Sequence, residues 1–507
     1  MNNLKRIRRL LLVIIVSVLI IVPVYAAIRG TPVTMVANIT TGQNPLVGSN
    51  YGTGLEPYQN TFYAAGRHWT FYIDSVSSFR YESFIADDTI TIDNHLIEFG
   101  TGLYVPQFSI WYDKPTNTVH YARHEIAAPN HHVVYRMGTP NEDGTITWAA
   151  AEQVVANTPA ELLTWRTNIA VDELGRPFVT WIDTDGIGGT TGIVYVEASS
   201  TTNGTWTAIP AVSNTFDTLN HHAWFVKLCP IGATGNMMEL VWSLEDQTGG
   251  LHDGEVALMS TRWNTGTGWA ANDTIAALGE MAAVTPHAFD LHDVGTLTWC
   301  VYTQAGTGDI YVRTRLDAQT WAASAAASMI FDGALVGFIP TLSGYVSNPP
   351  GEDLLLILND STLELRYSIH TNGDAVNVWS PLVDIWAVNT PLTEIITRHN
   401  AVYTYGSPVG FIWQVLYDDG VNPEYDNVYY WWFDNEELGY YLPPTTPLRT
   451  ANNMLEAILP IIIAVIVVII VFKKATESDN PIWSDIIVSV FGGVTAYFLT
   501  TVLLSII

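Results

Sequence analysis

The stretch RTNIAVDELGRPFVTWIDTDGIGGTTGIVYVEASSTTNGTW, residues 166–206, decides the fold. It holds a polar start, an apolar strand, a tight turn at Gly175, a second strand centred on Trp181, an alternating strand over residues 193–197, and a closing Trp206. Short β-branched and aromatic runs separated by Gly, Asp and Asn are typical of antiparallel strands joined by turns. One such stretch therefore predicts a unit of four strand-like pieces.

The same pattern recurs along the chain. Two less regular copies cover residues 59–91 and 106–148. Later copies start near His221, His287, Pro340 and Arg398, and their second strands are marked by Trp242, Trp299, Leu356 and Trp413. A spacing of roughly 55 to 60 residues is typical of four-stranded propeller blades with long loops.

This repetition predicts an all-β fold, a propeller over residues 57–440. Seven blades are favoured, and six apply if the first copy only caps the ring. Residues 27–56 form an extension that could supply a ring-closing strand. Two stacked β-sandwiches are the alternative. The tryptophans within apolar strands are expected in the core between blades: Trp69, Trp111, Trp181, Trp242, Trp299 and Trp413. Those at unit ends are also expected to serve mainly in packing: Trp206, Trp269, Trp321 and Trp379.

The first 26 residues resemble a secretory signal. Four basic residues precede an apolar run over residues 10–22, and Ala26 ends a small-residue cleavage site. Cleavage after Ala26 is the favoured interpretation, and an uncleaved signal anchor is the alternative. The mature chain would then be exported.

The C-terminus predicts two membrane spans. Residues 454–472 and 482–507 are apolar, and a polar hairpin over residues 473–481 with two lysines separates them. Basic residues stay on the cytoplasmic side, which places the propeller outside the cell after a linker over residues 441–453. Small residues in the last span could support close helix packing and an oligomer.

The chain is strongly acidic, with a formal charge of −28 and an isoelectric point near 4.6. Such a surface disfavours nucleic acid and fits salty surroundings or attraction of divalent cations. Cys229 and Cys300 could form a disulfide or remain buried thiols. Four sequons, at Asn38, Asn203, Asn272 and Asn359, fit an exported glycoprotein.

Candidate ligand-binding residues lie where the first strand of each unit begins. In a propeller these positions surround the axial mouth, where Arg, His and Asn can hydrogen-bond a sugar. Such residues could equally tie one blade to the next. The candidates are Arg166, Asn168, His221, His222, His287, Arg398 and His399.

A calcium loop is a second, weaker hypothesis. Asp183 and Asp185 alternate before Gly186, as carboxylates do in calcium loops, but no Glu follows at the expected place. Acidic turns between strands are common. Calcium is therefore the one cofactor that the sequence suggests, and no other is indicated.

The turns near the unit ends resemble the Asp-box of the sialidase-type bacterial neuraminidase repeat (BNR), S-x-D-x-G-x-T-W. Asn264, Gly266 and Trp269 keep three of its positions, and Asp143 with residues 147–148 keeps another three. The resemblance implies a sialidase-like propeller. A sialidase would also carry an Arg-Ile-Pro motif, an arginine triad and a Tyr/Glu nucleophile, which this sequence does not show, so no catalytic residue is assigned. Propeller polysaccharide lyases, with His, Arg and Tyr near the axis, are similar in kind.

The sequence thus favours a membrane-anchored extracellular propeller for recognition, which binds a glycan or a protein partner at a cell or virion surface. The alternatives are a surface carbohydrate-active enzyme, either a sialidase-like hydrolase or a polysaccharide lyase, and a structural surface protein. A carboxylate or Tyr in reach of the axial candidates would favour the enzyme.

Overall fold

The computed structural model describes the strands of the repeated region and many of their turns. The described residues are 34–39, 60–73, 78–85, 90–98, 108–127, 130–149, 151–158, 163–184, 192–206, 221–232, 237–246, 255–281, 288–332, 340–347, 351–359, 365–386, 394–401, 409–417 and 425–433. The expected signal at residues 1–26 and the two expected membrane spans lie outside them. In the part of the chain that is described, no helix has the length and hydrophobicity of a membrane span.

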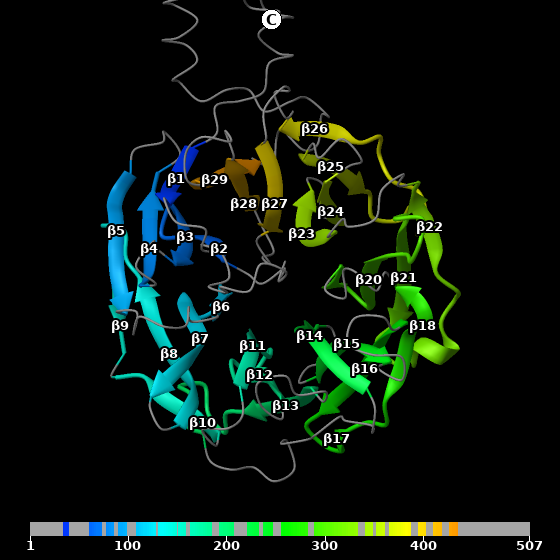
Figure 1. Cartoon of the computed structure of the whole chain (residues 1–507), viewed down its shortest axis with the longest axis horizontal. Coiled ribbons are helices and arrows are strands. Elements are labelled where there is room, and N and C mark those ends of the chain that lie inside the picture. The colour runs from blue at the N-terminus through cyan, green and yellow to red at the C-terminus, as the bar shows by residue number, and fades with distance from the viewer. Residues whose placement is uncertain are drawn as a thin grey trace, which may run out of the picture. The chain divides into compact units, whose positions relative to one another are not determined.

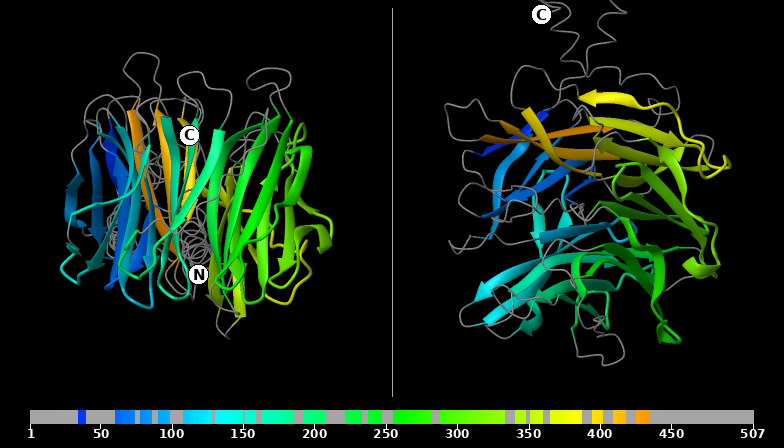
Figure 2. Two further views of the ribbon diagram at one scale, coloured as in Figure 1. Left: turned by 90° about the horizontal axis from the view of Figure 1, so that it is seen from below. Right: turned by 45° about the vertical axis from the view of Figure 1, so that its right-hand side comes forward.

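The described strands form antiparallel meanders arranged radially around a central axis (Figures 1 and 2). This arrangement confirms the all-β propeller and excludes two stacked sandwiches. The first two sheets are β2 (Thr61–Ala64), β3 (Arg67–Ile73), β4 (Phe79–Phe84) and β5 (Ile90–Glu98), then β6 (Phe108–Asp113), β7 (Thr118–Ala127), β8 (Asn130–Pro140), β9 (Ile146–Trp148) and β10 (Gln153–Thr158).

An eight-stranded sheet follows. It contains β11 (Leu163–Val171), β12 (Pro177–Thr184), β13 (Gly192–Ala198), β14 (His221–Ile231), β15 (Met237–Asp246), β16 (Val256–Asn264), β17 (Gly268–Trp269) and β18 (Asp273–Met281). Two meanders, β11–β13 and β14–β18, join in it through a single parallel pair, Gly192 opposite His222. Counted by hydrogen bonding, the described strands of the propeller therefore form six sheets. The favoured count of seven is not confirmed, because the third and fourth predicted units merge.

The remaining three sheets complete the ring. They are β19 (Phe289–Val294), β20 (Leu297–Thr303), β21 (Ile310–Leu316) and β22 (Ser328–Phe331), with the short helix η1 (Trp321–Ala323); β23 (Thr341–Ser347), β24 (Gly351–Asn359), β25 (Leu365–His370) and β26 (Val383–Trp386); and β27 (Glu394–Ala401), β28 (Val409–Tyr417), β29 (Tyr425–Phe433) and β1 (Thr34–Ile39). In this last sheet β1 pairs antiparallel with β29, so strands from both ends of the repeated region share one sheet.

The core consists of apolar side chains between neighbouring meanders. Five of the six tryptophans expected there are buried as predicted, namely Trp69, Trp111, Trp181, Trp242 and Trp299. The side chain of Trp413 lies outside the described residues. Burial of a large aromatic side chain stabilises a fold by about 2–3 kcal/mol. These residues therefore account for much of the packing that holds the ring together.

A series of polar contacts also links the first strands of neighbouring blades. Asn168 Nδ2 donates to Ser109 Oγ on β6 at 3.1 Å, and its Oδ1 accepts from Leu228 N on β14 at 2.9 Å. Lys227 on β14 donates to one carboxylate oxygen of Asp290 on β19. The other oxygen of Asp290 accepts from Leu342 N on β23 at 2.8 Å. Bonds between buried polar groups avoid the cost of leaving them unpaired. These contacts fix the angular position of successive blades.

Candidate functional site

The candidate residues fall into two groups. Asn168 is 3% exposed, and its side chain hydrogen-bonds to both neighbouring blades, so its role is to tie blades together. Arg166 lies at the end of the propeller where the first strands begin. For His221, His222, Arg398 and His399 the structure gives backbone pairing but no side-chain description, and His287 lies outside the described residues.

Three first strands that carry candidate residues share an irregularity, a shift in the register of their pairing. The pairing register shifts between Trp165 and Asn168 on β11, between Ala223 and Phe225 on β14, and between Ile396 and Arg398 on β27. A β-bulge bends a strand and redirects a side chain, and bulges are frequent beside functional sites. No register shift occurs on β6, β19 or β23. The three bulged first strands carry Arg or His near their starts, whereas β19, which follows the candidate His287, is regular.

The bulge on β11 forces an unusual backbone conformation on Arg166. Its φ is +60°, in the left-handed region that favours glycine. A non-glycine residue there costs of the order of 1 kcal/mol and persists where the surroundings impose it. The side chain is nevertheless buried, with the residue 7% exposed. Strain at a buried arginine near the axial mouth marks this position for a functional role.

The next blade places an indole beneath this arginine. Trp224, from the bulge on β14, lies with its ring centroid 5.7 Å from Arg166 Cζ, a cation–π distance. The tryptophan is half-buried and donates from Nε1 to Oε2 of Glu245 on β15. Two neighbouring meanders therefore contribute to one cluster, which we call the Arg166 cluster: Arg166, Trp224 and Glu245.

Glu245 is the least expected member of the Arg166 cluster. It is 1% exposed, and its Oε1 has no hydrogen-bond partner among the described residues. Ser243, two residues earlier on the same face of β15, has a buried hydroxyl that is likewise without a partner there. An unsatisfied buried polar group costs about 1–3 kcal/mol. A ligand that hydrogen-bonds these oxygens would recover that cost.

The calcium hypothesis is left without further support. Asp183 is 4% exposed at the end of β12, opposite Thr164, and Asp185 lies outside the described residues. Among the residues that the structure describes, no three or more His, Cys, Asp or Glu side chains group in a way suited to a metal ion. The two cysteines are separate, buried thiols, and burial raises the pKa of the Cys300 thiol.

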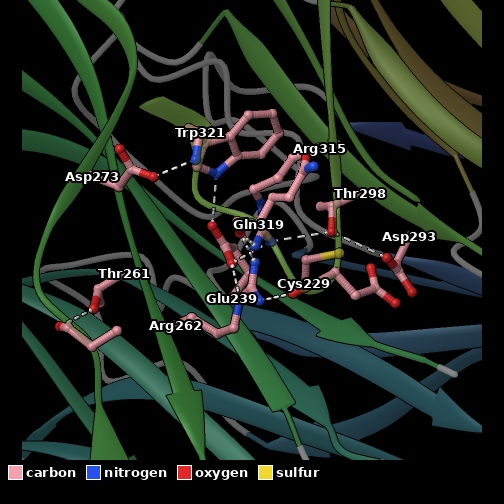
Figure 3. A network of polar contacts seen from close by, with 12 residues as sticks. Cys229, Glu239, Thr261, Arg262, Asp273, Asp293, Thr298, Arg315, Gln319 and Trp321 are labelled. Atoms are coloured by element: carbon pink, nitrogen blue, oxygen red, sulfur yellow. Dashed lines mark hydrogen bonds and ion pairs between the residues drawn. The ribbon is translucent and has the colours of Figure 1, made fainter. Parts of the chain in front are cut away.

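The opposite end of the propeller contains a second polar network, between β15 and β21, which we call the Glu239 joint (Figure 3). Glu239 Oε2 accepts from Arg315 Nη2 at 2.8 Å, and its Oε1 accepts from Trp321 Nε1 at 2.9 Å. Arg315 lies over the Trp321 ring, 5.1 Å from its centroid. Both charged side chains are 2% exposed. Both oxygens of the Glu239 carboxylate are bonded, so this network joins neighbouring blades, while Arg315 Nε has no hydrogen-bond partner among the described residues.

The Asp-box-like turns also serve in packing between blades. In the turn before β9, the Asp143 carboxylate accepts from the backbone N of Thr145 in the same turn at 2.9 Å. Ser83 Oγ, on the neighbouring meander, donates to Gly144 O at 2.9 Å. Further along the chain, Trp206 contacts the Tyr135 ring of the preceding sheet at 5.2 Å. These turns close each meander onto its neighbour. The resemblance to the sialidase repeat is not confirmed as a family relationship.

Comparisons with known proteins agree with the architecture and go no further. Neither a protein-family model nor a curated protein sequence matches this chain. Among solved structures, an ulvan lyase, a polysaccharide lyase, is similar with a TM-score of 0.48 and 9% identity over 79% of this chain and 96% of that one. The six-bladed lectin of the fungus Aleuria aurantia gives a TM-score of 0.36 and 12% identity over 65% and 95%.

A protein of unknown function from Dyadobacter fermentans is also similar, with a TM-score of 0.39 and 12% identity over 64% of this chain and 93% of that one. Identities of this size and TM-scores below 0.5 describe a common type of architecture. They carry no ligand or activity over to this chain. The chemistry must therefore be argued from its own residues.

The sequence could find only part of the Arg166 cluster. Arg166 was a candidate because it starts a first strand. Trp224 and Glu245 were missed: Trp224 follows the more conspicuous residues 221–222, and Glu245 is one of many acidic residues near a strand end. Glu245 pairs in register with His222. Because β14 and β15 are consecutive antiparallel strands of similar length, the end of β15 lies beside the start of β14, and this relation is the signal that could have found Glu245.

Proposed function

We propose that this chain is a carbohydrate-binding propeller that uses the Arg166 cluster as its site. The observation that carries the proposal is the buried Oε1 of Glu245, which has no hydrogen-bond partner among the described residues and belongs to a carboxylate bonded to Trp224, the indole over which the strained Arg166 lies. A sugar ring could place its apolar face on Trp224 while its hydroxyls bond to Glu245 and Arg166. With its expected signal and C-terminal spans, the chain would present this site on the outside of a cell or of an enveloped virion.

A glycan array probed with the full chain in detergent micelles tests the proposal. We expect selective binding, and we expect Trp224→Leu to weaken it by about two- to tenfold, since stacking on an aromatic ring is worth about 0.5–1.5 kcal/mol. Trp148→Leu is the matched control, because Trp148 is also half-buried under an arginine, Arg136 at 5.5 Å, but at the opposite end. A folded chain that binds no glycan, or equal losses in both variants, would contradict the proposal.

A second function, a carbohydrate-active enzyme, is favoured by one observation. Glu245 pairs in register with His222, which brings a buried carboxylate to the axial candidates, as a general acid or base would require. Incubation of array-selected glycans with the full chain, followed by mass spectrometry, separates the two functions. Products that disappear in Glu245→Gln would establish turnover, and unchanged glycans would leave recognition as the function.

A further inference from the structure

The charges of the Arg166 cluster indicate which class of sugar it accepts. The guanidinium of Arg166 lies over Trp224, and the same indole is bonded to the Glu245 carboxylate. A second buried carboxylate, that of Asp183, lies at the same end of the neighbouring strand β12. Among the described side chains of the Arg166 cluster and β12, one arginine therefore accompanies two carboxylates. An anionic ligand would meet local repulsion in addition to the chain's formal charge of −28.

The hydrogen-bonding needs of the cluster lead to the same class. Glu245 Oε1 can only accept, so it needs a ligand group that donates. The carboxylate of a uronic acid and a sulfate ester present acceptors only, whereas a hydroxyl both donates and accepts. Arg166 supplies donors and has no acceptor. Two neighbouring hydroxyls on one sugar ring would answer both, one donating to Glu245 and the other accepting from Arg166.

We infer that the site recognises a neutral sugar through adjacent hydroxyl groups and excludes uronic acids and sulfated sugars. This inference rests on the proposed function and narrows it. It also bears on the enzyme alternative, because it disfavours anionic polysaccharides as substrates. The expected discrimination comes from the carboxylates of Glu245 and Asp183 and from the need of Glu245 Oε1 for a ligand group that donates.

The test uses the full chain and matched pairs of immobilised sugars. Each pair consists of a neutral hexose, presented as its glycoside, and the corresponding uronic acid or sulfate ester. We expect the neutral member to bind at least about tenfold more tightly. Binding of the neutral sugar should change little between about 0.05 and 0.5 M salt, because charge–charge terms, which salt screens, contribute little to it.

A charge-removing variant sharpens the test. In Glu245→Gln the carboxylate becomes an amide of the same shape that can donate, so the preference for the neutral member should shrink several-fold. Glu255→Gln removes an exposed carboxylate at the start of β16 and should leave the preference unchanged. Tighter binding of the anionic members overturns the inference and leaves carbohydrate binding intact. Absence of binding to every sugar by a folded chain overturns the proposed function itself.

Discussion

The Arg166 cluster and the Glu239 joint contain the same three residue types and differ in how their bonds are completed. In the Glu239 joint, Arg315, Trp321 and Glu239 engage one another, and Arg315 and Glu239 form an ion pair at 2.8 Å. In the Arg166 cluster, Trp224 bonds to Glu245, but Oε1 of Glu245 has no partner in the described part of the chain. Trp321 is 1% exposed, whereas Trp224 is half-buried.

This difference separates a structural network from a binding site without reference to residue identity. In a buried ion pair whose carboxylate has both oxygens bonded, as in Glu239, the bonds contribute to a unique packing arrangement. A buried carboxylate with an unpaired oxygen and a left-handed arginine beside it costs free energy that packing does not return. We therefore expect a Glu→Gln substitution to lower the free energy of unfolding much more in the Glu239 joint than in the Arg166 cluster.

The largest expected effect tests this difference between the two sites directly. Glu239→Gln leaves Arg315 and Arg262 without their carboxylate, and removal of one partner of a buried pair costs about 3–5 kcal/mol. Glu245→Gln removes a carboxylate whose one oxygen is unpaired, so the free energy of unfolding should change by less than about 1 kcal/mol. Chemical denaturation of the full chain, followed by near-UV circular dichroism, measures both. Equal losses would show that the Arg166 cluster is as structural as the Glu239 joint.

The repetitive part of the fold was predictable from sequence because it depends on local patterns. Alternating strands, turns at Gly175 and its equivalents, and a tryptophan in most of the second strands recur at regular spacing. The merging of two units was not predictable. It depends on one parallel pair, Gly192 with His222, and nothing in either local sequence requires that the two residues meet.

The site was only partly predictable for a related reason. Arg166 and Asn168 are two residues apart, a spacing that places side chains on one face of a regular strand, and both contact β14, Asn168 through Leu228 N and Arg166 over Trp224. The bulge between Trp165 and Asn168 breaks that periodicity. Its presence depends on the pairing of β11 with β12, which local composition does not encode.

A smaller effect is expected at Arg166 itself. Arg166→Gly removes the cost of a left-handed non-glycine residue, so the free energy of unfolding should fall little or rise by up to about 1 kcal/mol, while sugar binding is lost. Asn117→Gly is the matched control, because Asn117 also has a positive φ, +52°, in the turn between β6 and β7. It should leave binding intact. Retained binding in Arg166→Gly would remove the arginine from the site.

The smallest effect concerns the carboxyl of Asp317, beside the Glu239 joint. Burial raises the pKa of Asp317, and the nearby Arg262 and Asp293 only partly oppose this rise. Neither Asp317 oxygen accepts a bond from a donor group among the described residues. The folded chain therefore holds this proton more tightly than the unfolded chain does. Stability from this group is present at low pH and is lost as pH rises through the raised pKa.

Asp317→Asn resembles the protonated carboxyl at every pH. We expect the variant to be more stable than the parent at neutral pH by about 1 kcal/mol, and the difference to vanish as the pH approaches the ordinary range for aspartate, near 4. Asp374→Asn, at an exposed turn, should leave the free energy of unfolding unchanged at both pH values. Unfolding of the three proteins compared at acid and neutral pH gives the sign. A variant less stable at neutral pH would mean that Asp317 is ionised and stabilised by Arg262, so that the Glu239 joint extends to a second ion pair.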